Sequence, residues 1–261
     1  MITDNNILTK EEENIIKNNL VLSSDFAWYR NESMIGKKHQ PDIAKDYPIY
    51  IHNLKSCGSD TWNSEWSEFF ISIIRRFIKK NKIFTKNHTV LRACVNETLP
   101  KKTNDIMCNP HVDYTINHKI FILYLTDSSG DTVIYNEKWK EGKEQVHAIK
   151  DNNLNKHASI TPEFGKLVCF NGLNYHAVKF PKAKDRRIIC IFAISEECSH
   201  AQLQTGKNFN WYVCVNELTK KKKINKRKKS IVYARYTLTS DWKKSLKPFE
   251  QDVAPYPFGE N

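Results

Sequence analysis

The amino-acid sequence predicts a mainly β protein that folds as a sandwich or jelly roll. Between residues 89 and 194 it carries eight short apolar runs separated by turn-forming residues such as Ser128-Ser129-Gly130, a pattern typical of such folds. The last run, 188–194, is apolar on both faces, as expected for a strand in the middle of a buried sheet. An amphipathic helix precedes the strands and offers an apolar stripe that can cover one sheet.

Two helices are predicted before residue 89. Thr9 and Glu12 have the spacing of a capping box at the start of a helix over 9–20. The helix over 64–80 repeats apolar residues at i, i+3, i+4, i+7 and i+8 without a break. These residues are Trp66, Phe69, Phe70, Ile73, Ile74, Phe77 and Ile78. We expect this helix to brace one sheet of the β core.

From residue 89 the pattern changes to that of strands. The predicted strands are 89–97, 106–109, 119–125, 131–135, 157–160, 166–170, 175–180 and 187–194. Two further strands are expected at 211–218 and 231–238. The chain is therefore divided into an N-terminal segment (1–88) with the supporting helix, a β core (89–196) and a C-terminal extension (197–261).

Composition limits the class of protein. With 261 residues, 40% of them hydrophobic, the chain has enough apolar side chains for a real core. No apolar run approaches the roughly 20 residues of a membrane span, and the first residues do not form a signal peptide. We therefore expect a soluble intracellular protein, cytoplasmic or nuclear, without a membrane partner. Of its seven cysteines, Cys94, Cys169 and Cys190 lie in apolar runs and are expected to be buried and reduced.

The net charge of +12 favours acidic partners, although a generally lysine-rich composition would produce the same number. The segment Lys220–Lys229 is a basic run in which the residues other than Ile224 and Asn225 are lysine or arginine. It is interpreted first as a solvated loop, then as a contact for phosphates or another polyanion, and then as a nuclear-import patch.

One constellation of residues points to chemistry. His111 and Asp113 form a His-x-Asp pair at the end of a predicted strand, and His176 lies in a later strand. Two imidazoles and one carboxylate are the ligand set of a facial triad, which holds one face of a non-haem Fe(II) and leaves the other face open. Alone, the His-x-Asp pair is a weak signal, so the prediction depends on its combination with His176 and with an arginine that follows.

An arginine at the entrance of the buried strand 187–194 needs an anionic partner, because an unpaired buried cation is very costly. A bound dicarboxylate would supply one through a bidentate contact. Arg186 and Arg187 are the two candidates, and they face opposite sides of the strand. We favour Arg186, which shares its side with Ile188, Cys190 and Phe192.

The order His111-x-Asp113, His176, Arg186 resembles that of the 2-oxoglutarate/Fe(II)-dependent dioxygenases, in the branch of prolyl 4-hydroxylases and short viral and microbial members. The resemblance covers roughly residues 90–195. It includes the flanking stretches Arg92-Ala93-Cys94-Val95-Asn96, Tyr124-Leu125-Thr126 and Gly130-Asp131-Thr132-Val133-Ile134-Tyr135. One departure is Thr126, where relatives often carry Asn, and which is expected to alter a supporting hydrogen bond.

The resemblance implies a double-stranded β-helix with Fe(II) held by His111, Asp113 and His176. It also implies that Arg186 and the Tyr124 hydroxyl bind the distal carboxylate of 2-oxoglutarate. O2 would be the oxidant, and the resemblance allows ascorbate as a further cofactor. Two imidazoles and a carboxylate leave three coordination sites, enough for a bidentate cosubstrate and oxygen.

Three other residues of this region could belong to the site. His118 is interpreted as a loop histidine and not as a ligand, and Thr132 and Asn96 are weak candidates for lining the cosubstrate end of the cavity. The resulting hypothesis is a hydroxylase whose substrate is a peptide side chain such as proline, a nucleic acid or a small molecule. The alternative is a non-catalytic basic jelly-roll protein that binds nucleic acid or another polyanion.

Overall fold

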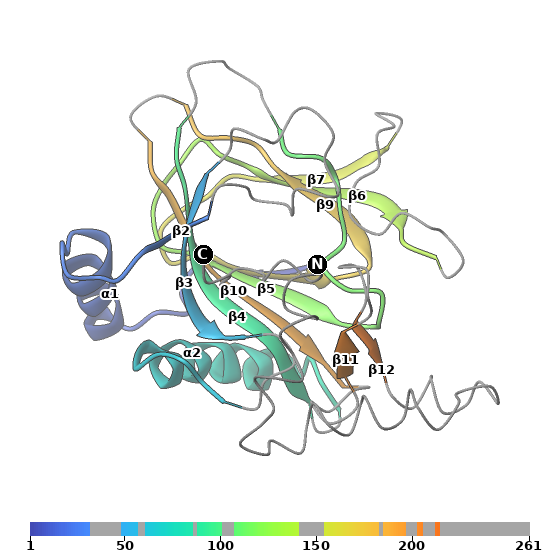
Figure 1. Cartoon of the computed structure of the whole chain (residues 1–261), viewed down its shortest axis with the longest axis horizontal. Helices are drawn as coiled ribbons and strands as arrows, with labels where there is room; N and C mark the ends of the chain where they lie inside the picture. Colours follow the sequence, from blue (N-terminus) through green and yellow to red (C-terminus); the bar gives the residue numbers. More distant parts are fainter. Residues whose placement is uncertain are drawn as a thin grey trace, which may run out of the picture.

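The computed structural model describes residues 1–31, 48–56, 61–85, 88–100, 107–140, 154–182 and 185–196, and the backbone of two short strands further on. Two antiparallel sheets dominate this part of the chain (Figure 1). The seven-stranded sheet has the order β1 (Ile2–Asp4), β8 (Leu167–Asn171), β5 (Lys119–Tyr124), β10 (Arg187–Ser195), β4 (Thr89–Thr98), β3 (Ile49–Lys55) and β2 (Tyr29–Asn31). The three-stranded sheet has the order β7 (Lys156–Ile160), β6 (Thr132–Lys138) and β9 (Asn174–Val178).

The chain winds back and forth between these two sheets. It leaves β4 in the large sheet, and two isolated bridges then join it to the small sheet, His111 to His176 in β9 and Met107 to Lys179 just after β9. β5 returns to the large sheet, β6 and β7 lie in the small one, and β8, β9 and β10 alternate large, small, large. This winding makes the protein a jelly roll in the form of a double-stranded β-helix. The predicted fold class is confirmed.

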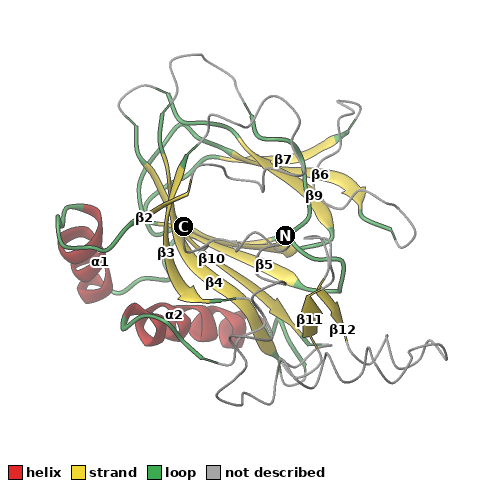
Figure 2. Cartoon of the chain, viewed as in Figure 1, coloured by secondary structure: helices red, strands yellow, loops and turns green. Residues whose placement is uncertain are grey.

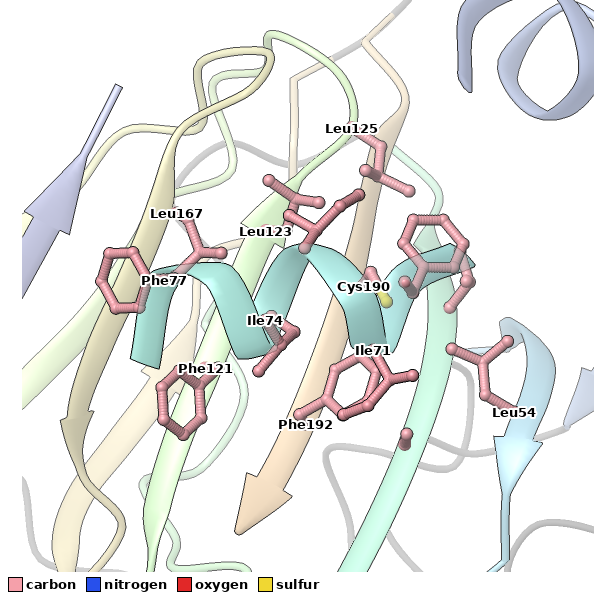
Figure 3. Packing of buried hydrophobic residues seen from close by; sticks show 14 of the residues in the cluster. Leu54, Ile71, Ile74, Phe77, Phe121, Leu123, Leu125, Leu167, Cys190 and Phe192 are labelled. Carbon is pink, nitrogen blue, oxygen red and sulfur yellow. The ribbon is translucent and has the colours of Figure 1, made fainter. Parts of the chain in front are cut away.

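The N-terminal helices cover the face of the large sheet that points away from the small sheet (Figures 1 and 2). α2 (Trp66–Asn81) agrees with the helix predicted at 64–80. Its buried side packs on β5 and β10, where the Phe77 and Phe121 rings meet edge to face at 6.2 Å (Figure 3). Burial of such aromatic rings contributes more to stability than any surface contact of the helix.

The first predicted helix is also present. α1 (Lys10–Ile16) begins at the expected capping box, in which Thr9 Oγ1 accepts the Glu12 N–H and the Glu12 carboxylate accepts the Thr9 N–H. It continues as one turn of π-helix, η1 (Lys17–Val21). Ile16 and Leu20, two of its apolar residues, are fully buried in the core beneath the large sheet. The capping box and the buried apolar residues therefore both favour a helix at this place in the chain.

Most predicted strands agree with observed ones within a few residues, but three strands before residue 56 were not predicted. β1, β2 and β3 extend the large sheet at its two edges. β1 and β2 have only three residues each, too few to show an alternating pattern. The strand predicted at 106–109 is irregular where it is described, and its one isolated bridge there joins Met107 to Lys179, the residue after β9.

Part of the C-terminal prediction lies outside the described residues. The strand expected at 211–218 coincides with β12 (Tyr212–Cys214), which pairs with β11 (Leu203–Thr205). The strand expected at 231–238 and the basic segment Lys220–Lys229 belong to the part that is not described. The three-part division of the chain and the polyanion contact stay predictions.

Two simpler expectations can be compared directly. Cys94, Cys169 and Cys190 are buried and have free thiols, as predicted. Among the described residues, the helices are too short or too polar to span a bilayer.

Candidate active site

A cavity of about 70 Å³ lies between the two sheets of the jelly roll. A buried water needs about 10–15 Å³ of such space, so the cavity has room for several waters or a small organic acid. Its floor comes from β3, β4, β5 and β10 of the large sheet, and its roof comes from β6, β9 and the segment with Cys108, His111 and Asp113. The lining residues are Ile49, Arg92, Asn96, Thr98, Cys108, His111, Asp113, Ile122, Thr132, His176, Val178, Arg187, Ile189 and Ile191.

His111, Asp113 and His176 meet in this cavity. One ligand atom from each residue lies within 4.8 Å of the other two, and the two imidazole centroids are 4.7 Å apart. Backbone pairing produces this arrangement, because His111 N donates to His176 O and His176 N donates to His111 O, both at 2.9 Å. The register between the His-x-Asp segment and β9 thus brings together side chains that are distant in the sequence.

The backbone also sets the orientation of both imidazoles. His111 Nδ1 lies 3.0 Å from Asn109 O, and His176 Nδ1 lies 3.1 Å from Asn174 O. A carbonyl oxygen can only accept, so each Nδ1 carries a proton and each Nε2 is the nitrogen left for a metal. This is the usual outer-sphere arrangement of metal-bound histidines.

The charges of the cluster suit a cation. Burial alone would raise the pKa of Asp113, but Arg92 and the two histidines hold it well below its ordinary value, so the carboxylate is ionised. Desolvation lowers the pKa of His176 to about 4, helped by the charge of His111. Desolvation acts on His111 in the same direction, but Cys108 and Asp113 outweigh it and raise the pKa of His111 to about 9. At neutral pH the His176 imidazole is therefore neutral, and the His111 imidazole carries a proton that it can exchange. Both face the ionised carboxylate of Asp113.

Arg187, and not Arg186, points into the cavity. The Arg187 side chain is 1% exposed. Its Nε donates to Gly130 O and its Nη2 donates to Thr132 Oγ1, both at 2.7 Å. Among the described residues no carboxylate lies within ion-pair distance of it. Asp131 acts on it only through longer-range attraction, and the Asp131 carboxylate accepts a hydrogen bond from Ser159.

The preference for Arg186 as the cavity arginine is therefore a wrong placement. Arg186 does share its side of the strand with Ile188 and Cys190, as predicted, but those residues pack under the helices and not in the cavity. Its side chain is 45% exposed and pairs with the buried carboxylate of Glu97. The prediction that Arg186 and Arg187 face opposite sides of the sheet is correct. The prediction that the side of Arg186 faces the cavity is wrong.

Tyr124 and Thr132 lie beside Arg187. Tyr124 is fully buried, and its hydroxyl lies 2.7 Å from Thr132 Oγ1. Burial raises the pKa of Tyr124, which keeps the phenol protonated. Thr132 Oγ1 thus accepts from both Arg187 and Tyr124, so the hydroxyl proton of Thr132 remains for another acceptor. An anionic oxygen placed here would meet a guanidinium and a hydroxyl.

Two polar oxygen atoms on side chains of β4, both in residues that line the same cavity, have no hydrogen-bond partner among the described residues. Asn96 Oδ1 and Thr98 Oγ1 are buried and make no hydrogen bond, although both belong to the cavity wall. Buried polar atoms normally have partners, so orphans that line a cavity indicate a polar ligand. Thr98 lies opposite Arg187 in the ladder between β4 and β10, which places it at the guanidinium end.

Sequence reasoning treated Asn96 as a weak candidate and missed Thr98, Cys108 and Arg92 as cavity residues. Alternation along β4 places 92, 94, 96 and 98 on one side of the strand. Both sides of β4 are buried, however, so the pattern of hydrophobicity could not show which side faces a ligand.

His118 is not a member of the ligand cluster, as expected, but it is no exposed loop residue. It is 2% exposed and its Nδ1 lies 2.8 Å from Ile116 O. A Cβ on Gly172 would lie 2.0 Å from His118 Nε2. His118 therefore fills the core behind the site, and only a glycine at 172 leaves room for it.

No family model and no curated protein matches the chain. Similar solved structures include an oxidoreductase of the 2OG-Fe(II) oxygenase family from Burkholderia pseudomallei, at 13% identity and TM-score 0.47, covering 69% of this chain and 78% of the other. A prolyl hydroxylase from Trichoplax adhaerens, in complex with a hypoxia inducible factor peptide fragment, has 14% identity and TM-score 0.46, with coverage of 84% and 86%.

A third similar structure is the viral collagen prolyl hydroxylase of Paramecium Bursaria Chlorella virus-1, at 14% identity and TM-score 0.41, covering 74% of this chain and 94% of the other. All three resemble the chain distantly. In overall structure the chain thus resembles 2-oxoglutarate/Fe(II) oxygenases and prolyl hydroxylases.

Proposed function

We propose that this chain is a 2-oxoglutarate- and Fe(II)-dependent oxygenase that hydroxylates a C–H bond of its substrate. One observation carries the proposal. A cluster of two imidazoles and a carboxylate shares a cavity with a buried arginine that has no carboxylate partner among the described residues. The first feature suits a divalent metal and the second suits an organic anion, and this family of oxygenases needs both.

The donor set fits Fe(II). Two imidazole nitrogens and one carboxylate oxygen are the ligands of non-haem iron sites that keep open positions. His111 and His176 would each offer the Nε2 that the backbone carbonyls leave free, and Asp113 would offer an ionised oxygen. His111 would release the proton on its Nε2 when the ion binds. In both histidines the proton on Nδ1 would stay hydrogen-bonded to its backbone carbonyl.

The opposite end of the cavity fits the distal carboxylate of a 2-oxo diacid. Arg187 would supply charge, and Thr132 would supply its hydroxyl proton, which stays free because Thr132 Oγ1 accepts from Tyr124 and Arg187. Thr98 and Asn96 are unsatisfied in the same wall and would contact the polar atoms of the ligand. A charge-assisted contact with buried arginine is about twice as strong as a neutral hydrogen bond.

The residues of the cavity would have different roles in the proposed reaction. The metal with 2-oxoglutarate and O2 supplies oxidative decarboxylation coupled to oxidation of a C–H bond. The three ligands fix the position of the metal, and Arg187 fixes the cosubstrate at the closed end of the cavity. Apolar side chains of Ile49, Ile122 and Ile189 limit the entry of water, which protects reactive species from side reactions.

The substrate is a separate question. The resemblance of the sequence motifs to prolyl 4-hydroxylases makes a protein side chain such as proline the first class to test, followed by nucleic acids and small molecules. Ascorbate belongs in the assay because the resemblance allows it.

The proposal predicts a ternary complex that can be detected before any substrate is known. Adding 2-oxoglutarate to the protein with Fe(II) under anaerobic conditions should produce the visible charge-transfer band of a chelated 2-oxo acid. Under air, succinate should form slowly. His176→Ala should abolish both signals, because it removes a ligand.

His157→Ala is the matched control. His157 is an exposed histidine on β7 whose ring contacts Asn136, so its removal should leave the band and the succinate unchanged. A His176→Ala protein that still forms succinate from 2-oxoglutarate at the wild-type rate would contradict the ligand assignment.

A further inference from the structure

We propose that Thr126 is the positioning residue for Arg187, acting through the turn between β5 and β6. The inference rests on the proposed function, because it concerns how the chain holds the arginine that would bind 2-oxoglutarate.

The Thr126 hydroxyl is bonded to the backbone on both sides of Arg187. Its Oγ1 donates to Arg186 O at 2.8 Å and accepts from Ile188 N at 3.0 Å. One hydroxyl thus satisfies a carbonyl and an N–H that bracket a single residue. A hydroxyl is the smallest side-chain group that can both donate and accept in this way.

The two hydrogen bonds of Thr126 continue the pairing between β5 and β10 beyond its last regular residue pair. The regular pairing of β5 with β10 stops at Tyr124 opposite Ile189, and Leu125 N then donates to Ile188 O at 2.9 Å. Beyond that point the Thr126 side chain takes the place of a backbone partner. Arg187 is held from the other side by Thr98 on β4, so its backbone is fixed on both edges.

The same turn also fixes the Arg187 side chain. Gly130 O accepts the Arg187 Nε, and a Cβ on Gly130 would lie only 2.8 Å from Arg187 Cδ. The turn is itself fastened by Asp185, whose carboxylate accepts the N–H and the hydroxyl of Ser129 at 3.1 and 2.6 Å. Residues 126–130 therefore hold both the backbone around Arg187 and its guanidinium.

Such support matters because arginine has a long, flexible side chain. A contact with a small anion loses strength steeply when the charged group is displaced by about 1 Å. Thr126 itself does not line the cavity, so we expect its substitution to affect cosubstrate binding through the position of Arg187.

The test compares two substitutions of Thr126. Thr126→Val keeps the shape and removes both hydrogen bonds, whereas Thr126→Ser keeps the hydroxyl. For each protein, the anaerobic charge-transfer band gives the Kd for the cosubstrate 2-oxoglutarate, a metal titration gives the Kd for Fe(II), and succinate formation gives kcat and the cosubstrate KM.

We expect Thr126→Val to weaken cosubstrate binding by about tenfold, seen as a rise in both the cosubstrate Kd and the cosubstrate KM. Its kcat and its affinity for Fe(II) should stay within about twofold of wild type, because the metal ligands are untouched. Thr126→Ser should restore the wild-type values.

Asp127→Ala is the matched control in the same turn. The Asp127 carboxylate accepts the Phe164 N–H at 2.6 Å, so its bond leads away from Arg187. This variant should leave the cosubstrate Kd within about twofold of wild type, even if its Tm falls. Asp185→Ala provides a second route to the same effect, since it loosens the turn from the far side, and it should raise the Kd in the same direction as Thr126→Val.

The outcomes separate the two proposals. A folded Thr126→Val protein with the wild-type cosubstrate Kd, or an Asp127→Ala protein with the same loss as Thr126→Val, would overturn the positioning role alone. If Thr126→Val does not fold, an unchanged Kd in Asp185→Ala would overturn it. Absence of any 2-oxoglutarate complex in the wild-type protein would overturn the proposed function, and the role of Thr126 with it.

Discussion

Two adjacent arginines at the start of β10 have opposite surroundings. Successive residues of a strand point to opposite faces of the sheet, so Arg186 lies on the helix side and Arg187 on the cavity side. Arg186 compensates the charge of Glu97, a carboxylate that is 6% exposed. Within the described part of the chain, the hydrogen bonds of the Arg187 side chain go to neutral partners, Gly130 O and Thr132 Oγ1. A single position in the chain therefore separates a structural ion pair from a candidate ligand-binding group.

Methionine substitutions should separate the two roles. Arg187→Met should raise the cosubstrate Kd by about tenfold or more, because the charge-assisted contact is lost. Arg186→Met should leave that Kd nearly unchanged and lower the free energy of unfolding by about 1–3 kcal/mol, because it leaves the Glu97 carboxylate unpaired in a buried site. Calorimetric titration and urea unfolding of both proteins measure the two effects. Equal loss of binding in both variants would contradict the separation.

At the scale of elements, α1 is held to α2 by one charged pair. The Arg76 Nη2 of α2 donates at 2.6 Å to the Glu12 carboxylate that also closes the capping box. Arg76 further donates to Ile7 O. Burial alone would raise the pKa of Glu12, but the bonds from Arg76 and from the Thr9 backbone hold it below its ordinary value of 4.5. The folded state thus favours the ionised carboxylate.

This coupling predicts an acid-sensitive contribution to stability. A carboxyl group with a lowered pKa stabilises the folded state above its unfolded pKa and loses that contribution as the pH falls through its folded pKa. Glu12→Gln can still form the capping box but carries no charge. It should therefore lower the free energy of unfolding at pH 7 by about 0.5–1 kcal/mol and make little difference at about pH 3.

Urea unfolding at the two pH values measures the effect. Glu11→Gln is the control, because Glu11 is an exposed residue of the same turn and should change stability at neither pH by more than about 0.5 kcal/mol. A difference between wild type and Glu12→Gln that is as large in acid as at neutral pH would contradict the linkage.

At the scale of the whole molecule, the candidate site joins the two sheets. The cluster of His111, Asp113 and His176 lies on the small-sheet side of the cavity, on β9 and the segment paired with it. Arg187 belongs to the large sheet. A metal ion and a diacid bound between them would connect both layers of the jelly roll, and would bind the folded state only.

Binding should therefore raise the melting temperature. At ligand concentrations about 100 times the Kd, a ligand specific for the folded state adds about 2.7 kcal/mol, which corresponds to roughly 5–10 °C for a domain of this size. Anaerobic Fe(II) with 2-oxoglutarate should produce such a shift in wild type, and Asp113→Ala should lose it. A shift of the same size in Asp113→Ala would show that the ligands bind elsewhere.

The sequence by itself determined the local features of this protein. The capping box of α1, the buried stripe of α2, the strands of the jelly roll and the His-x-Asp pair depend on neighbouring residues, so their patterns can be seen in the chain. Short edge strands such as β1 and β2 have no pattern of their own and are stabilised by the sheet they join.

Only the tertiary structure decided which faces meet. Strands β4 and β10 are buried on both sides, so alternation predicted that Arg186 and Arg187 diverge but could not tell the helix side from the cavity side. The pairing of His111 with His176 and the convergence of Thr98, Thr132 and Tyr124 on Arg187 arise from contacts between distant segments. The physical reason is that a double-stranded β-helix buries both faces of its large sheet, one under helices and one around a ligand.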